Sequence, residues 1–297
     1  MKDDQRLQYI GGIEDRVEQL ISRQIWQGID AARCRTWMQQ FQDRDIALLG
    51  ACLLDSFIFR SRAQVEALLK SVFLGPELNG AAAAHDFSLI EKLRSKKVDP
   101  GVRLSPVIRL DQSPTKSGTY VLRLLARSLR LNEGWMKWPQ ALPAEPMSVH
   151  TVILVDDFCG TGSQFSDFIK LTQFDAFMKA RPKCKVVYVT AAAHTDGIAK
   201  IAKDYPHIEL LPAEVLGAGH HFFEGEALKR VRSAVDGDEL RQSYDQLAAD
   251  MKLGGASIGP LGFDDQALSY AFAHGTPNNT LPIYWYQSER WSSLVDR

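Results

Sequence analysis

The segment that most constrains the fold is Thr151–Phe165, whose sequence is TVILVDDFCGTGSQF. It opens with a short uninterrupted apolar run, Thr151–Val155, which is typical of a strand buried on both faces in a parallel sheet. Two aspartates follow at once, and the glycine-containing stretch Gly160–Ser163 then predicts a turn that leads into a helix. A buried strand that passes through such a turn into a helix indicates an α/β protein.

Further strands and helices alternate around this segment. The sequence predicts strands at Leu104–Leu110, Lys185–Ala191 and His207–Leu211, and helices at about residues 120–131, 163–178 and 196–204. Parallel strands joined by helices are connected by right-handed crossovers. We therefore expect an α/β fold built on a parallel sheet.

The start of the chain has helical rather than strand periodicity. Apolar side chains recur at helical spacing from Leu7 to Ile25. Capping residues predict three further helices: one capped by Asp30, one at Asp45–Phe59 capped by Asp43, and one that begins near Ser61. We expect residues 1–80 to form an α-helical region packed on a second domain, residues 81–297.

The C-terminal stretch is mixed in character. It predicts a helix at about residues 227–250, a second helix at 266–273 capped by the Asp264-Asp265 pair, and a final strand at 278–286. Two features there invite a functional interpretation. The segment Thr276–Trp285 could contact a base, although a structural turn anchored by a tryptophan explains it slightly better. His220-His221 could supply an acid or base, although a pair of surface histidines with their hydrogen bonds satisfied is the simpler explanation.

Composition excludes several classes of protein. The formal net charge is −1, so no overall basic field points to nucleic acid or to a membrane surface. The four cysteines are widely spaced and form no CxxC pair, which argues against a zinc site or a disulfide framework and favours reduced thiols. The N-terminus is polar and no apolar run reaches membrane-spanning length. We expect a cytoplasmic protein.

The turn after the central strand suits a sugar phosphate. Gly160 and Gly162 allow the backbone to approach an anion at a helix start, and Thr161 and Ser163 add hydroxyl donors. The Asp156-Asp157 pair would repel a phosphate but can accept hydrogen bonds from a ribose diol. The alternative, an acidic helix cap beside a chance glycine turn, fits Asp264-Asp265 better, because that pair lacks the Thr-Gly-Ser sequence.

A second anion-binding element is predicted one crossover upstream. The loop before the helix at 120–131 contains Lys116, Ser117 and Gly118, a mobile cation beside a backbone that can wrap an anion. Arg109 or Arg123 could assist. Taken alone, the loop is explained better by an ordinary surface turn with a solvated lysine, and the motif downstream is what favours the functional interpretation. After the strand at 185–191, Thr195 and Asp196 could cap a helix or contact a ligand.

The central segment resembles the signature of type I phosphoribosyltransferases, a hydrophobic strand, two acidic residues, three variable residues and Thr-Gly-Ser/Thr. The matching residues are Ile153, Leu154, Val155, Asp156, Asp157, Thr161, Gly162 and Ser163. The resemblance implies a Rossmann-like core with a C-terminal hood, and phosphoribosyl pyrophosphate or a related nucleotide as ligand. It also implies Mg²⁺ bound through the diphosphate, with no protein metal ligand assigned.

The same resemblance assigns roles to the site residues. Asp156 and Asp157 would hold the ribose hydroxyls, and one of them would stabilise an oxocarbenium-like transition state. Lys116, with Ser117 and Gly118, would stabilise the leaving diphosphate. A 5′-phosphate cradle is implied at Phe158, Cys159, Gly160, Thr161, Gly162 and Ser163. The alternatives are a sensor that binds the sugar phosphate without turnover and a scaffold whose loop is vestigial.

More closely, the chain resembles the phosphoribosyltransferase-like effectors of bacterial conflict systems. This rests on Trp37 and Phe41 in WMQQF, on KSGTY, on the central motif, on TPNNTLPIYW and on Trp291. Some of these effectors accompany retron reverse transcriptases. The resemblance implies an antiviral effector or toxin, with a reverse transcriptase/RNA–DNA complex or another defence-system protein as partner.

Overall fold

The structure, a computed structural model, describes residues 3–44, 46–81, 88–109, 111, 113, 116–225, 228, 237–255 and 257–297. The chain divides into two compact units. Unit 1 combines residues 1–63 with residues 217–297, and unit 2 is the continuous segment 64–216. The domain boundary expected at residue 80 falls inside unit 2.

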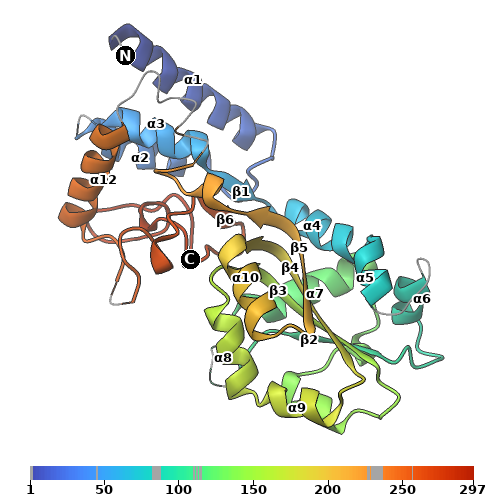
Figure 1. The fold of residues 1–297 in the computed structure, drawn as a ribbon. Coiled ribbons are helices and arrows are strands. Elements are labelled where there is room, and N and C mark those ends of the chain that lie inside the picture. Colours follow the sequence, from blue (N-terminus) through green and yellow to red (C-terminus); the bar gives the residue numbers. More distant parts are fainter. Residues whose placement is uncertain are drawn as a thin grey trace. The chain divides into compact units, whose positions relative to one another are not determined.

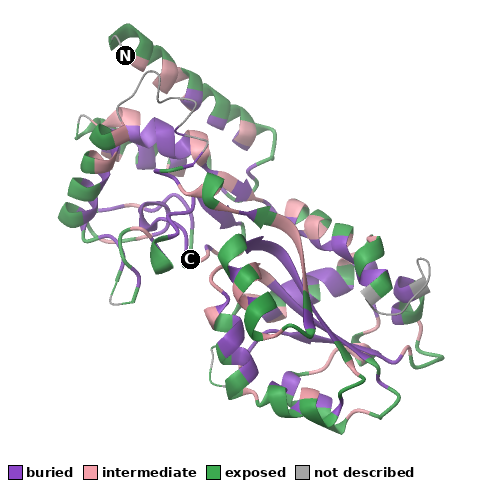
Figure 2. Ribbon diagram, viewed as in Figure 1, coloured by how far each residue is buried: buried purple, intermediate pink, exposed green. Residues whose placement is uncertain are grey.

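Unit 2 contains a four-stranded sheet in the order β2-β3-β4-β5, with every neighbouring pair parallel (Figure 1). Its strands are β2 (Val102–Pro106), β3 (Thr151–Cys159), β4 (Lys185–His194) and β5 (Ile208–Leu216). β3 and β4 are buried along most of their length, as their continuous apolar sequences require (Figure 2). The expected α/β fold with a parallel-sheet core is confirmed.

Helices cover both faces of this sheet. The connections contain α7 (Ser117–Leu129), α8 (Ser163–Leu171), α9 (Phe174–Ala180) and α10 (Thr195–Asp204). One core joins aromatic residues of α8 and α9 to alternate residues of β3 and β4, and includes Phe165, Phe168 and Tyr188. The Phe165 and Tyr188 rings stack with their centroids 4.2 Å apart. α7 contacts β2 and β3, and α5 contacts β4 and β5.

The remaining helices precede the sheet. They are α4 (Arg62–Leu74), α5 (Pro76–Ala81) and α6 (Ser88–Arg94). Two 3-10 turns, Glu133–Trp135 and Pro139–Ala144, lie between α7 and β3.

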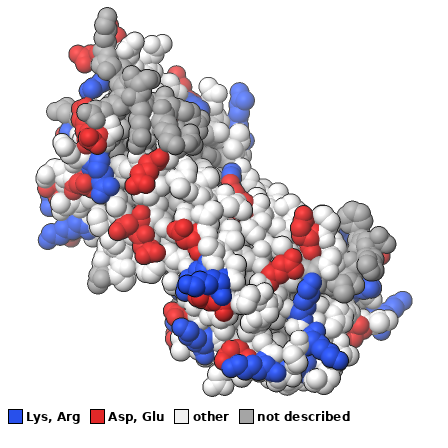
Figure 3. Space-filling model, in the orientation of Figure 1, with Lys and Arg blue, Asp and Glu red and all other residues white. Residues whose placement is uncertain are grey.

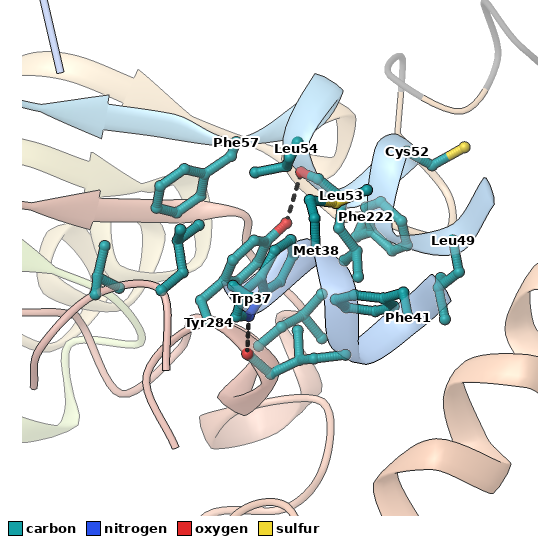
Figure 4. Packing of buried hydrophobic residues seen from close by; sticks show 14 of the residues in the cluster. Trp37, Met38, Phe41, Leu49, Cys52, Leu53, Leu54, Phe57, Phe222 and Tyr284 are labelled. Carbon is teal, nitrogen blue, oxygen red and sulfur yellow. Dashed lines mark hydrogen bonds between the residues drawn. The ribbon is translucent and has the colours of Figure 1, made fainter. Parts of the chain in front are cut away.

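Unit 1 packs the N-terminal helices against the C-terminal segment. Its elements are α1 (Asp3–Ser22), α2 (Ala31–Gln42), α3 (Ala47–Ser56), α12 (Gly237–Met251) and the parallel pair β1 (Ile58–Arg60) and β6 (Tyr270–Phe272). Figure 4 shows how Trp37 and Tyr284 lie side by side in its core. The Trp37 indole donates to the Ile283 carbonyl at 3.0 Å, and the Tyr284 hydroxyl donates to the Leu53 carbonyl at 2.8 Å.

The helical start of the chain is confirmed, with one exception. Asp30 caps α2 as expected, since its carboxylate accepts from the Ala32 amide at 2.6 Å. The third helix ends at Ser56, not at Phe59, because Ile58–Arg60 pairs with Tyr270–Phe272. The start expected at Asp45 lies outside the described residues.

Three expectations for the C-terminal stretch are wrong. Residues 270–272 form β6 instead of continuing a helix, and 278–286 contains the 3-10 turn Pro282–Tyr284 instead of a strand. Asp264 and Asp265 cap no helix, since both have positive φ within or beside a 3-10 turn. The helix at 227–250 is described only from Gly237, so its expected first part, apart from residue 228, lies outside the described residues.

Charge and hydropathy agree with the composition. Acidic and basic side chains are interspersed on the face shown in Figure 3. None of the helices in the described ranges is both long enough and apolar enough to cross a membrane.

Candidate functional site

β3 carries both aspartates of the central motif inside the sheet. The strand continues to Cys159, so the expectation that it ends at Val155 is wrong by several residues. Asp156 pairs in register with Thr190 of β4, and Cys159 with Ala193. The pleat of a strand sends successive side chains to opposite faces. Asp156 and Asp157 therefore have different protein neighbours, although the Asp157 charge still acts on Asp156.

Asp156 is buried on the α8 side of the sheet. The residue is 2% exposed. One carboxylate oxygen accepts from the Asp157 amide at 3.0 Å, and the other accepts from the Tyr188 hydroxyl at 3.4 Å. Burial, and then the neighbouring Asp157 charge, raise the pKa of Asp156 well above its ordinary value. The same burial raises the pKa of Tyr188, so its hydroxyl stays a donor.

Asp157 is half-buried and meets the start of α7. The Ser117 hydroxyl donates to its carboxylate at 2.9 Å. This hydrogen bond joins the two segments that the sequence singled out separately, the acidic motif and the Lys-Ser-Gly sequence. Adjacent parallel strands β2 and β3 present their carboxyl ends at one edge of the sheet, which is where ligands of open α/β sheets bind.

The turn after β3 leads directly into α8. Gly162 lies at φ 75° and ψ −1°, a left-handed conformation that favours glycine, and it caps α8. The Thr161 hydroxyl donates to that of Ser163 at 3.1 Å, and Ser163 begins the helix. The first-turn amides of a helix carry partial positive charge and suit an anion. Phe158 and Gly160 are half-buried beside them.

Cys159 supports this turn from inside. Its side chain is buried, and burial raises the pKa of the thiol to about 12. Cys159 is therefore a neutral packing residue and not a nucleophile.

Two further glycines allow helices to approach the loop closely. A Cβ at Gly197 in α10 would lie 2.4 Å from the Gly160 carbonyl oxygen, and one at Gly118 in α7 would lie 3.1 Å from the Val107 carbonyl oxygen. The sequence interpretation missed Gly197. The available signal was a glycine in the first turn of a helix, where it weakens the helix unless something must approach.

The upstream element differs from the expected loop. Ser117 and Gly118 are the first residues of α7, and Lys116 is its cap with an exposed side chain. A diphosphate would therefore meet a helix start instead of a wrapped loop. Residues 112, 114 and 115 of the expected loop, and residue 110 at the end of the expected strand, lie outside the described residues. Arg109 contacts Asp111 at 3.0 Å and Asp167 at 3.6 Å, and Arg123 is exposed on α7.

The other candidates have structural roles. His194, and neither Thr195 nor Asp196, caps α10 by accepting from the Asp196 amide. His220 and His221 accept from the amides of Gly217 and Glu224. In Thr276–Trp285 the side chains from Asn279 onward are mostly buried in unit 1, so the tryptophan-anchored turn is the confirmed interpretation.

A family model described as PRTase-CE matches residues 34–297. The chain belongs to the PRTase-CE family. The expected relationship to type I phosphoribosyltransferases is thereby confirmed, and the PRTase-CE match includes β3 and the whole candidate site. No curated protein matches the chain.

Two solved structures are similar to parts of this PRTase-CE chain. The AQ2163 protein from Aquifex aeolicus is 12% identical, with a TM-score of 0.29, over 54% of this chain and 88% of its own. Orotate phosphoribosyltransferase from Aeropyrum pernix is 13% identical, with a TM-score of 0.29, over 52% of this chain and 71% of its own.

Proposed function

We propose that this protein binds phosphoribosyl pyrophosphate, or a related nucleotide, at the junction of β3, α7 and α8 and acts as a phosphoribosyltransferase-like enzyme. The observation that carries the proposal is the hydrogen bond from Ser117 to Asp157. It places the Asp157 carboxylate, which can accept hydrogen bonds from a ribose diol, next to the start of α7. The start of α8 follows directly after β3 in the chain. A sugar with phosphates at two positions matches these three groups: its hydroxyls bind the carboxylate, and its two phosphates bind the two helix starts.

The two aspartates have different tasks in this proposal. Asp157 is accessible and accepts hydrogen bonds from the ribose hydroxyls. Asp156 is enclosed and positions Asp157 through the peptide amide it binds. The negative charge beside the sugar stabilises an oxocarbenium-like transition state. Thr161, Gly162 and Ser163 hold the 5′-phosphate.

The leaving diphosphate lies at the start of α7. Lys116 supplies a mobile positive charge there, and Ser117 and Gly118 supply backbone amides. Mg²⁺ would bind chiefly through the diphosphate, and would neutralise charge on the leaving group. In the described ranges no three His, Cys, Asp or Glu side chains are grouped to hold a metal ion. A carboxylate such as Asp157 could complete a site formed mainly by ligand oxygens and water.

A sensor without turnover is the second candidate. The observation in its favour is the burial of Asp156, which leaves one accessible carboxylate where the family motif has two. Pyrophosphate release from the Mg²⁺ complex, with a panel of bases and nucleotides as acceptors, separates the two functions. Release that stops in Asp157→Asn supports the enzyme. Thermal stabilisation without pyrophosphate release supports the sensor. If neither stabilisation nor release is observed, both functions are rejected.

The resemblance to conflict-system effectors extends the proposal to antiviral defence. We infer an effector that partners hold in check, such as a retron reverse transcriptase complex. Phage plating on cells that carry the complete locus tests this. Wild type should reduce plaque formation, and Asp157→Asn should not. Equal plating on both strains would contradict the defensive role of this site.

A further inference from the structure

A basic pocket lies at the opposite end of the sheet from the candidate site. Its volume is about 680 Å³, and it lies between the end of α6 and the connection from α7 to the Glu133–Trp135 turn. The lining residues are Arg94, Lys96, Arg130, Leu131, Asn132, Glu133, Gly134 and Trp135. α7 runs from the Asp157 end of the sheet to this pocket, so the two sites are separate.

The three cations of the pocket have no ion-pair partner in the described part of the chain, and Glu133 is the one carboxylate in the lining. Such a local excess of positive charge contrasts with the net charge of −1 for the whole chain. Arg94 is also held in place, because its Nε donates to the Leu129 carbonyl at 2.7 Å. A positioned guanidinium is well suited to bind phosphate.

Arg130 occupies a position where a side chain is a disadvantage. It ends α7 in the left-handed conformation, with φ 56° and ψ 42°. Glycine adopts this conformation without steric cost and is the usual residue there, whereas other residues are disfavoured. An arginine at this position places its charge over the pocket despite that cost. The pocket therefore has a cation at a position where glycine is the usual residue.

Trp135 gives the pocket a fixed aromatic wall. Its indole donates to the Ser95 carbonyl at 3.1 Å, and the Arg103 guanidinium lies 5.1 Å from the ring centroid. The Arg103 side chain is 3% exposed and is bound by Asp99 and Glu145, so that contact faces the interior. Trp135 is half-buried and is one of the residues that line the pocket. A fixed aromatic ring beside cations can stack a base while the cations bind its phosphate.

We propose that this pocket binds nucleoside phosphates, with phosphate on Lys96 and Arg130 and the base against Trp135. The side-chain amide of Asn132, whose oxygen accepts from the Gly134 amide, can donate to the base edge. The ligand is a free nucleotide or a nucleotide unit of a single strand, since both present the same two groups. A solvated basic surface would instead bind anions without regard to a base.

The test measures binding of a short fluorescent single-stranded DNA by anisotropy at several salt concentrations. Lys96→Gln/Arg130→Asn removes two cations, and asparagine tolerates the left-handed conformation. Lys170→Gln/Lys183→Gln removes two exposed cations elsewhere and is the matched control. We expect the pocket variant to bind about tenfold or more weakly, with a salt slope smaller by about 1.4, because each phosphate contact on a single strand contributes about 0.7. Thermal midpoints of both variants check that folding is retained.

Two further arms identify the ligand. A strand lacking bases should bind about tenfold more weakly than the intact strand. Calorimetry with ATP separates the sources: loss of ATP binding in the pocket variant supports a free nucleotide, and loss of strand binding alone supports a nucleic acid. The proposal would be overturned if the pocket variant and its control bound both the strand and ATP equally, if intact and base-free strands bound equally, or if wild type bound neither the strand nor ATP.

Discussion

At the scale of single residues, the Asp156-Asp157 pair shows what sequence reasoning can and cannot reach. The motif identified both residues. They are adjacent on β3, yet each side chain has a different hydrogen-bond partner. Tyr188, which binds Asp156, lies 32 residues away, and Ser117, which binds Asp157, lies 40 residues away. No local pattern encodes such contacts. The sequence therefore identified the pair as a candidate site but could not distinguish the environments of the two carboxylates.

Burial of Asp156 leads to a prediction about stability. The Asp156→Asn variant should have a higher free energy of unfolding at neutral pH, by roughly 1–3 kcal/mol, because a buried carboxylate without a cation partner is costly. The pKa of Asp156 is raised on folding from its ordinary value of 3.8, so the two proteins should be equally stable below about that pH. The difference should grow as the pH rises above it. Urea unfolding across this pH range measures it.

Asp99 is the matched control and should behave in the opposite way. Its hydrogen bonds with Arg103 lower the pKa of Asp99 from 3.8 to about 2. The Asp99→Asn variant should therefore be less stable than wild type at neutral pH, and the deficit should disappear as the pH falls from about 4 to 2. If Asp156→Asn and Asp99→Asn shift stability in the same direction at neutral pH, the account of their environments is wrong.

At the scale of elements, the site is made by helix starts that converge on one loop. The strand–helix alternation predicted the order of these elements, because buried strands and amphipathic helices have local signatures. It did not predict their closeness. The Gly197 position in α10 is set by contact with the backbone of the Gly160 turn, which only the assembled fold reveals.

The contact at Gly197 predicts a local cost of adding one methyl group. Gly197→Ala should destabilise the protein by roughly 1–3 kcal/mol, because the new Cβ would overlap the Gly160 carbonyl oxygen. It should also weaken sugar-phosphate binding by displacing the turn. Gly11→Ala in α1 is the control: nothing lies within 4 Å of its added Cβ. That change should be neutral or stabilising by up to about 1 kcal/mol. Equal effects in denaturant unfolding would contradict the packing account.

At the scale of the whole molecule, the C-terminal segment belongs to the same compact unit as the N-terminal helices. Unit 1 is built from both ends of the sequence, whereas unit 2 is continuous. The expected boundary at residue 80 followed composition, which changes where the strands begin. β1 and β6 have three residues each and pair over more than two hundred positions, so neither carries a local signal. This is why a helix was predicted over part of β1 and over all of β6.

Because unit 1 is built from both ends of the chain, a substitution near the C-terminus should destabilise the N-terminal helices of the same unit. Trp291 is 1% exposed, packs edge-to-face on Phe41 and donates to the Ile283 carbonyl at 3.0 Å. Trp291→Ala should cost ~3–5 kcal/mol in unit 1. Hydrogen exchange should accelerate in α1–α3 and α12 and remain slow in β3 and β4. Phe168→Ala in unit 2 should give the reverse pattern, and loss of protection in both units for either variant would contradict separate cores.

The central claim is that Asp157 binds the ribose of a diphosphorylated sugar. Calorimetric titration of phosphoribosyl pyrophosphate with Mg²⁺ into wild type, Asp157→Asn and the control Asp264→Asn tests it most directly. Asp264 belongs to the other aspartate pair and is exposed. We predict saturable binding by wild type and by Asp264→Asn, and a loss of about tenfold or more in Asp157→Asn, since hydrogen bonds to a charged group contribute ~1.5–3 kcal/mol. Equal affinity of all three proteins, or no binding by wild type, would contradict the account.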